Sequence, residues 1–286
     1  MMSSAILALL HGYGTLIGGF LMAYDILERI ASDKRIQVEE EKNRISLEEM
    51  KQKALQTKSM LPAFSFKKAL GKEGMSFICE VKKASPSKGI IAEDFPYVKI
   101  AEEYERAGAD CLSVLTEEKY FLGCDEYLEE IRGAVDIPIL RKDFVIDVYQ
   151  IYQAKVIGAD AVLLIVALLD EDTIREYIDV CNELGLSALV ETHDENEINI
   201  ALSAGAKIIG VNNRNLKDFS VDISNTTKLR EYAPKEVLFV AESGIKTRED
   251  VECFEKQDTN AVLIGETLMR ADDKKKKLDE LKGLKY

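Results

Sequence analysis

Five ionisable side chains lie inside or directly after short apolar runs of this sequence. They are Glu80, Lys82, Lys142, Glu191 and Glu242. A charge at the end of a buried strand costs free energy unless it is paired or used. Taken singly, each could be a structural ion pair or a solvated loop charge. If all five meet at one site, they can hold carboxylate and lysine pKa values apart, which general acid–base catalysis requires.

Two glycine-containing loops near the end of the chain suggest phosphate binding. The first is Ser243-Gly244-Ile245 and the second is Gly265-Glu266-Thr267, and each follows an apolar run. Glycine lets backbone N–H groups approach an anion closely, although either loop alone could be an ordinary turn. In a (β/α)8 barrel, the loops after the last two strands commonly bind phosphate. The two loops together therefore favour a phosphorylated ligand.

Apolar residues next to these polar strand ends could form a wall of the same site. They are Pro86, Phe121, Phe144 and Leu163. Each taken alone is simply a core residue. Together they would suit a substrate with an apolar part beside its phosphate.

Eight short apolar runs, separated by amphipathic stretches of helical length, predict the elements that must position these groups. The runs are rich in Val, Ile and Leu, and they cover residues 76–82, 111–115, 137–141, 161–166, 187–191, 207–211, 237–241 and 261–265. Continuous apolar runs are typical of parallel strands that are buried on both faces. Glycines before the next strand predict left-handed helix ends at Gly108, Gly158, Gly185 and Gly205.

Strands that alternate with helices predict an α/β fold, a (β/α)8 TIM barrel with an N-terminal helical extension. The alternative is a doubly wound open sheet. That fold usually carries a glycine-rich dinucleotide motif after its first strand, and residues 76–90 contain no GxGxxG. We expect residues 22–286 to form one barrel domain, with 22–75 as the extension and 76–286 as the barrel.

The extension itself is expected to be mostly helical. Residues 25–57 have helical periodicity, and Ser46-Leu-Glu-Glu predicts the capped start of a second helix. The Leu61-Pro62 pair and the glycines Gly71 and Gly74 then predict a loop.

The first 21 residues are apolar and require a separate interpretation. No charged residue occurs from Met1 to Tyr24, and about 20 apolar residues can span a bilayer. His11, the repeated glycines and the lack of a positive flank argue against an anchor or a signal peptide. We interpret residues 1–21 as an extension outside the fold, with a membrane anchor as the alternative.

Composition argues against nucleic-acid binding, a disulfide framework and a histidine-based metal site. The 286 residues include 38 Lys+Arg and 51 Asp+Glu, a net charge of −13 that disfavours nucleic acid. The five cysteines are scattered, which predicts no disulfide framework and a reducing cytoplasm. With only His11 and His193, little material exists for a histidine-based metal centre, so no metal is expected.

Motifs at all but one of the predicted strand ends resemble those of the indole-3-glycerol-phosphate synthase family. The matching segments are EVKKASPSKG (80–89), LSVLTEEKYFLG (112–123), LRKDF (140–144), LVETHDE (189–195), GVNNRNL (210–216), AESGI (241–245) and LIGETLMR (263–270). Phosphoribosylanthranilate isomerase and the tryptophan synthase α chain share the phosphate loops but differ at the first and third strands. The resemblance runs from about Met22 to the C-terminus.

The resemblance implies a lyase of tryptophan biosynthesis that uses no cofactor. Its substrate, 1-(2-carboxyphenylamino)-1-deoxyribulose 5-phosphate, would close a ring and lose CO2 and water to give indole-3-glycerol phosphate. Lys142 would be the general acid for ring closure, and Glu191 the general base for a later proton. Lys82 would bind the anthranilate carboxylate and supply an acid for dehydration.

The remaining roles are implied in the same way. Glu80 would be an acidic partner at the first strand, while Asn212 and Glu242 would orient the ribulose hydroxyls and the amine. The groups implied for phosphate are Ser85, Gly244, Gly265 and the backbone amides of Glu266 and Thr267, with Ser243 and Arg214 nearby. The family's N-terminal extension is expected to cover the mouth of the barrel.

Two other functions remain as alternatives. One is another phosphate-binding barrel enzyme, such as a sugar-phosphate isomerase, which the set of Glu80, Lys82, Lys142 and Glu191 disfavours. The other is a non-catalytic barrel that serves as a partner subunit or a membrane-tethered scaffold, for which altered site residues would be expected. We expect a monomer that binds a small phosphorylated substrate and no membrane, unless residues 1–21 prove to be an anchor.

Overall fold

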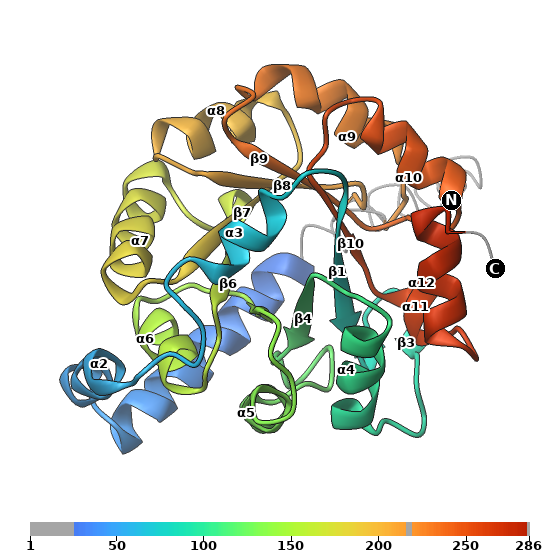
Figure 1. The fold of residues 1–286 in the computed structure, drawn as a ribbon. Helices are drawn as coiled ribbons and strands as arrows, with labels where there is room; N and C mark the ends of the chain where they lie inside the picture. Colours follow the sequence, from blue (N-terminus) through green and yellow to red (C-terminus); the bar gives the residue numbers. More distant parts are fainter. Residues whose placement is uncertain (1–25, 216–218, 285–286) are drawn as a thin grey trace, which may run out of the picture.

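Eight parallel strands close into a barrel in this computed structural model, which describes residues 26–215 and 219–284 (Figure 1). Their order around the barrel follows the chain. The strands are β1 (Ser76–Val81), β4 (Cys111–Leu115), β5 (Ile139–Lys142), β6 (Ala161–Ile165), β7 (Ser187–Thr192), β8 (Ile208–Asn212), β9 (Leu238–Glu242) and β10 (Ala261–Ile264). The predicted (β/α)8 barrel is confirmed, with strand boundaries that shift by at most two residues. The predicted extension of residues 1–21 lies outside the described residues.

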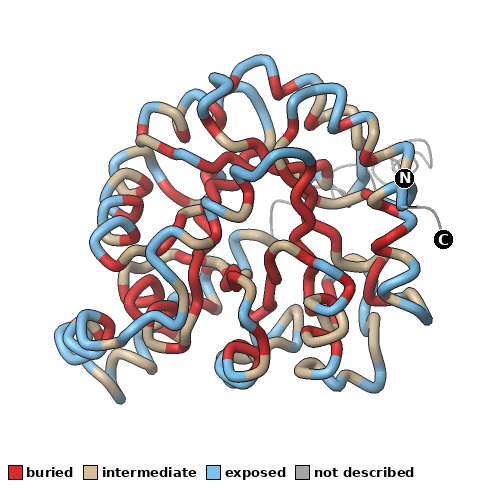
Figure 2. Tube along the Cα trace, in the orientation of Figure 1, coloured by how far each residue is buried: buried red, intermediate tan, exposed pale blue. Residues whose placement is uncertain are grey.

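Alternation along each strand builds two apolar layers. Ile78 packs inside the barrel, whereas its neighbours Phe77 and Cys79 pack outward among the helices. Successive side chains of a strand point to opposite faces, so a strand that is buried on both faces must be apolar throughout. The barrel wall and the inner faces of the helices are accordingly buried in Figure 2.

Helices follow the strands and surround the barrel. They are α4 (Tyr97–Arg106), α5 (Asp125–Arg132), α6 (Tyr149–Val156), α7 (Glu171–Leu184), α8 (Glu195–Ser203), α9 (Ser224–Leu229), α10 (Arg248–Glu255), α11 (Glu266–Met269) and α12 (Lys274–Lys282), with short 3-10 turns at η1 (Val166–Leu168) and η2 (Arg230–Tyr232). The predicted left-handed glycines have positive φ: Gly108, Gly158, Gly185 and Gly205. Glycine adopts this conformation without a Cβ penalty, and it turns the chain back toward the next strand.

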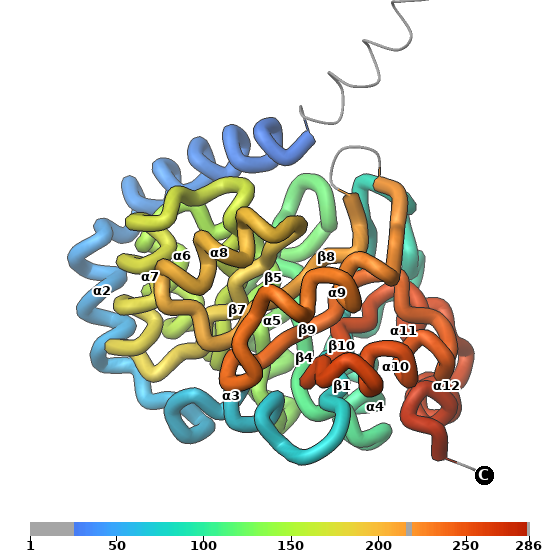
Figure 3. The backbone as a smooth tube through the Cα atoms, turned by 90° about the horizontal axis from the view of Figure 1, so that it is seen from above, coloured from blue at the N-terminus to red at the C-terminus, as the bar shows by residue number. Residues whose placement is uncertain are grey.

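The N-terminal segment contributes elements to both ends of the barrel. Residues 26–44 form a helix on the side of the barrel opposite α3 (Ser65–Leu70), as Figure 3 shows. Between them, α2 (Leu47–Gln56) packs against α6, and the Ser46 hydroxyl caps it by accepting from the Glu49 N–H at 3.3 Å. The predicted helical stretch is therefore two helices, and the second begins where the capping signal placed it.

The prediction of a loop between Pro62 and Gly74 was wrong in part, because α3 lies there. Phe66 and Leu70 of this helix are fully buried and pack with residues inside the barrel. Residues four apart lie on one face of a helix. The two side chains of α3 can therefore cover the end of the barrel opposite the helix of residues 26–44. Six residues are too few for helical periodicity to be recognised from the sequence.

A two-stranded hairpin also went unpredicted. Strands β2 (Ala84–Ser85) and β3 (Gly89–Ile90) pair antiparallel directly after β1.

Among the described residues, no helix is long and apolar enough to cross a membrane.

A buried ion pair near the start of the strands offers a test of this architecture. Asp160 accepts hydrogen bonds from Arg132 Nη1 at 3.0 Å, from the Ile139 N–H at 2.9 Å and from Ser65 Oγ at 3.1 Å. We expect Asp160→Ala to lower the free energy of unfolding by about 3–5 kcal/mol, because Arg132 would remain buried without its carboxylate. Urea unfolding measures this change. The control Lys235→Ala removes an exposed pair with Asp258 and should cause no measurable change; equal losses would contradict the account.

Candidate active site

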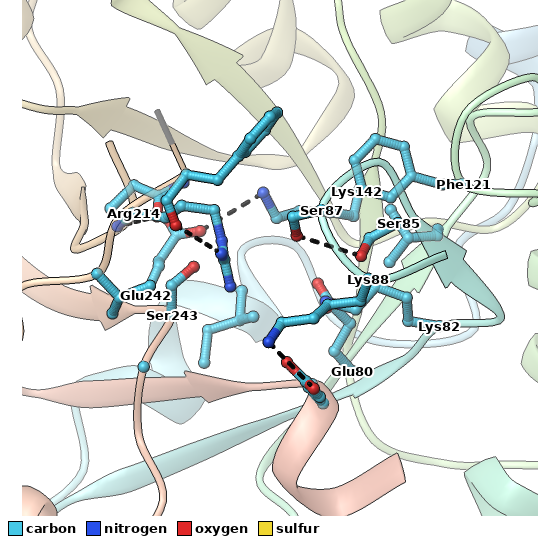
Figure 4. Close-up of a pocket in the computed structure, with 18 of the residues that line it drawn as sticks. Glu80, Lys82, Ser85, Ser87, Lys88, Phe121, Lys142, Arg214, Glu242 and Ser243 are labelled. Carbon is cyan, nitrogen blue, oxygen red and sulfur yellow. Dashed lines mark hydrogen bonds and ion pairs between the residues drawn. The ribbon is translucent and has the colours of Figure 1, made fainter. Parts of the chain in front are cut away.

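A cavity of about 790 Å³ opens at the carboxyl end of the barrel strands. Every residue predicted for the site from the sequence lines it. Figure 4 shows part of this lining, including Glu80, Lys82 and Lys142. They are Glu80, Lys82, Ser85, Pro86, Phe121, Lys142, Phe144, Leu163, Glu191, Asn212, Arg214, Glu242, Ser243, Gly244, Gly265, Glu266 and Thr267. In a (β/α)8 barrel this is the face that carries active sites.

The pleat of the strands explains why these groups meet. Four charged residues each lie two positions after an apolar residue that packs inside the barrel, in the pairs Ile78 and Glu80, Leu140 and Lys142, Leu189 and Glu191, Val240 and Glu242. Because side chains alternate with a period of two, each charged group faces the barrel axis one layer above the apolar core.

Lys142 lies at the centre of this layer. Its Nζ is 3.2 Å from Glu191 Oε2 and 3.5 Å from Glu242 Oε2. The lysine side chain is 15% exposed, whereas the two carboxylates are 3% and 2% exposed. The ammonium is therefore the member of this trio that is most accessible from the cavity.

Burial and charge set different protonation states for the three groups. Burial lowers the pKa of Lys142, but the surrounding carboxylates outweigh it and raise that pKa above its usual value. Burial raises the pKa of Glu191, yet Lys142 and His193 bring it below the ordinary range. For Glu242, burial and the charges of Glu191 and Glu80 outweigh Lys142 and raise the pKa to about 7. The site thus holds a lysine cation, an ionised glutamate and a glutamate that titrates near neutral pH.

Two glycines make room for the carboxylates. A Cβ on Gly265 would clash with the Glu80 carboxylate and would come 2.8 Å from Lys82 Nζ. A Cβ on Gly210 would clash with Glu242 Oε1. Lys82 and Glu80 form an ion pair, and Ser113 Oγ donates to Glu80 Oε2 at 3.4 Å. Gly210 opens the strand-end segment GVNNRNL, but nothing in the sequence indicated this close approach.

Cationic and hydroxyl groups gather at one end of the cavity. Arg214, Ser243 and Gly244 were predicted there, and Ser243 and Gly244 both have positive φ, of 68° and 85°. Three further cations line the cavity and were missed: Lys88, Lys246 and Arg270. Glu266 pairs with two of them, at 3.7 Å from Lys88 Nζ and 3.0 Å from Arg270 Nε. This end has the charge that a phosphate group requires.

One wall of the cavity is apolar, in contrast to its cationic end. The rings of Phe121 and Phe144 lie 6.0 Å apart at an angle of 41°. The helix of residues 26–44 adds Ile26, Leu27 and Ile30 to the cavity lining. These helix residues were not named in advance, although the helix was expected to cover the mouth. The wall can accommodate an aromatic group close to Lys142.

A buried ion pair fastens that helix to the barrel. Lys34 Nζ lies 2.9 Å from Asp143 Oδ1, and both side chains are almost fully buried. Thr116 Oγ1 donates to Asp143 Oδ2 at 2.8 Å. Burial raises the pKa of Asp143, but Lys34 and Arg141 outweigh it and lower the pKa below its usual value. The pair joins the covering helix to the residue that directly follows Lys142.

The fold and this cavity define the chain as a (β/α)8-barrel protein with acid–base and anion-binding groups at the carboxyl ends of its strands. The sequence model of the family "Indole-3-glycerol phosphate synthase" matches residues 27–281. The chain belongs to the indole-3-glycerol phosphate synthase family.

Similar proteins agree with this assignment. An indole-3-glycerol phosphate synthase of Ruminiclostridium cellulolyticum is 54% identical, covering 90% of this chain and 99% of the relative. One of Endomicrobium trichonymphae is 53% identical over the same shares of the two chains. Among solved structures, a 3-hexulose-6-phosphate synthase superposes with a TM-score of 0.60 at 16% identity, covering 73% of this chain and 99% of that chain. The last likeness shows the fold alone.

The raised pKa of Glu242 predicts a pH-dependent stability. Between the usual glutamate pKa and about 7, the folded state binds more protons than the unfolded state, so this group makes the protein less stable as pH rises. We expect the free energy of unfolding of the wild type, relative to Glu242→Gln, to fall by about 3 kcal/mol at most from about pH 5 to about pH 8. Urea unfolding of both proteins at both pH values measures this. A difference that stays constant with pH would contradict the assigned titration.

Proposed function

We propose that this chain is a carbon–carbon lyase that converts 1-(2-carboxyphenylamino)-1-deoxyribulose 5-phosphate to indole-3-glycerol phosphate, CO2 and water. The observation that carries the proposal is the ammonium of Lys142 between Glu191 and Glu242, at 3.2 and 3.5 Å, facing a cavity with one cationic end and one aromatic wall. The reaction belongs to tryptophan biosynthesis.

The two ends of the cavity would set the orientation in which the substrate binds. Arg214, the Ser243–Gly244 turn and the backbone at Gly265 are available for the phosphate, together with Ser85. Phe121 and Phe144 would hold the carboxyphenyl ring. Binding both ends would keep the ketone carbon and the ring carbon that bears the carboxylate close together, which lowers the entropic cost of closing the ring.

Ring closure needs an acid at the ketone oxygen. As the ring carbon attacks, the carbonyl π electrons move to oxygen, and Lys142 Nζ would donate a proton there. The high pKa of Lys142 means that a proton is always present for this step, and Glu191 and Glu242 would stabilise the ammonium before transfer. Lys82 would hold the carboxylate, paired in the free protein with Glu80.

The later steps need a general base as well as an acid. The carboxylate leaves as CO2, and the electrons of the broken C–C bond restore the aromatic ring. The new hydroxyl then leaves as water with a proton from Lys82. Glu191 would remove a proton from the neighbouring methylene carbon as the indole double bond forms. Its lowered pKa keeps it ionised for this role. Asn212 and Glu242 would orient the hydroxyls and the amine.

The N-terminal segment would serve as the cover of this site within a single domain of residues 22–286. Ile26, Leu27 and Ile30 face the cavity, and the Lys34–Asp143 pair holds their helix in place. We propose further that the protein acts as a monomer in the cytoplasm. The cysteines are free thiols, consistent with a reducing compartment.

A fluorescence assay of indole formation tests the proposal. The wild-type protein should convert the substrate, and Lys142→Ala should lower kcat by about 100-fold or more, because a general acid contributes that much. Lys235→Ala, an exposed lysine outside the cavity, is the control and should retain wild-type activity. A folded wild type that binds the substrate yet forms no indole product would rule out the lyase and favour a non-catalytic barrel.

A further inference from the structure

A second cavity, of about 610 Å³, adjoins the candidate active site on the side of β7 and β8. Leu27, Asn212, Arg214 and Asp222 line both cavities. His193 and Glu197 line only the second one. Solvent in this cavity can reach the imidazole, which is 17% exposed, whereas Glu191 is 3% exposed.

His193 lies between two carboxylates. Its Nδ1 is 3.0 Å from Glu197 Oε2, and its Nε2 is 3.4 Å from Glu191 Oε1. Glu197 Oε2 also accepts the backbone N–H of His193 at 2.7 Å, which fixes the loop between β7 and α8. Nε2 is buried and has no hydrogen-bond partner within the described residues, so Glu191 is the group it faces.

The two oxygens of the Glu191 carboxylate therefore face different neighbours. Oε2 faces Lys142 at 3.2 Å, and Oε1 faces His193 and accepts from Asn212 Nδ2 at 3.3 Å. The imidazole therefore lies on the side of Glu191 away from the reacting lysine. It can act on the carboxylate without contact with the substrate.

We propose that His193 is a positioning residue whose imidazolium form, held by Glu197, fixes the orientation of Glu191 and keeps its carboxylate ionised for proton abstraction. The inference rests on the proposed function, in which Glu191 is the general base. No bond to His193 forms or breaks in the reaction; its charge acts on Glu191 across 3.4 Å. The second cavity lets the imidazole equilibrate with solvent.

The charged surroundings favour the imidazolium. Burial lowers the pKa of His193, but the hydrogen bond to Glu197 and the charges of Glu191, Glu197 and Glu242 raise it above the ordinary value. Other charged groups around the second cavity are Glu28, Asp194, Arg214 and Asp222, three of them acidic. From α9, Asn225 presents no charge and donates to the His193 carbonyl at 3.3 Å.

The consequence is a dependence of activity on pH with a definite sign. A positive charge beside a carboxylate typically lowers its pKa by about 1–3 units. When the charge is removed, the acidic limb of the kcat/KM profile should move to higher pH by at least about one unit. The loss of activity should therefore exceed tenfold at low pH and should shrink as pH rises.

The test compares kcat/KM in His193→Gln, His193→Lys and the wild type from about pH 3.5 to about pH 9, because the acidic limb of the wild type lies below the usual glutamate pKa. His193→Gln should shift the acidic limb upward, and His193→Lys, which restores a cation, should shift it back. Glu195→Gln removes an exposed carboxyl group on α8, the helix that carries Glu197, and is the matched control that should leave the limb in place. An unchanged limb in His193→Gln, or a loss by the same factor at every pH, would overturn the proposal.

A second measurement keeps the inference separate from the proposed function. Carboxyl 13C NMR of Glu191 reports its titration whether or not the protein makes product. We expect the Glu191 titration to move to higher pH in His193→Gln and, by a smaller amount, in Glu197→Gln, which also serves if His193→Gln fails to fold. An unmoved Glu191 titration would refute the role of His193 alone, whereas absence of indole product from the wild type would refute the proposed function.

Discussion

The Lys142 cation, held among carboxylates at the mouth of the barrel, is the constraint on which the rest of the site depends. A lysine ammonium inside a barrel is stable only if carboxylates compensate the lost hydration, and Glu191 and Glu242 lie within 3.5 Å of it. Burial, together with the repulsion between neighbouring carboxylates, raises the pKa of Glu242 to about 7, whereas Lys142 and His193 keep Glu191 ionised. Glycines at 210 and 265 are needed because any side chain there would occupy the space of a carboxylate.

The helix of residues 26–44, which covers the mouth of the barrel, is tied to the same strand end as Lys142. Asp143 follows Lys142 directly and pairs with Lys34, so the same strand end that presents the Lys142 ammonium to the cavity also holds the helix above it. Breaking such a buried pair would leave an uncompensated charge, which gives the cover a strong preference for one position. That position keeps Ile26, Leu27 and Ile30 against the cavity.

The sequence predicted the barrel and the lining of its mouth well, for a physical reason. Parallel strands buried on both faces must be continuous apolar runs, and a charge two residues beyond an inward residue must face the axis. Contacts between distant segments had no such signal. Lys34 and Asp143 are 109 residues apart, and neither stands out on its own. His193 was noted only as one of two histidines, since its value lies in its distances to Glu191 and Glu197. The helix α3 and the β2–β3 hairpin were too short to show periodicity.

The most direct test of the central claim is a double-mutant cycle on kcat/KM with Lys142→Met, Glu191→Gln and the double variant. If the lysine and the carboxylate work as one ion-paired unit, the second substitution adds little once the first is made, and the coupling energy is large. The account predicts that the double variant is about as active as the worse single variant. Losses that simply multiply, with no coupling energy, would show that the two groups act independently and would contradict it.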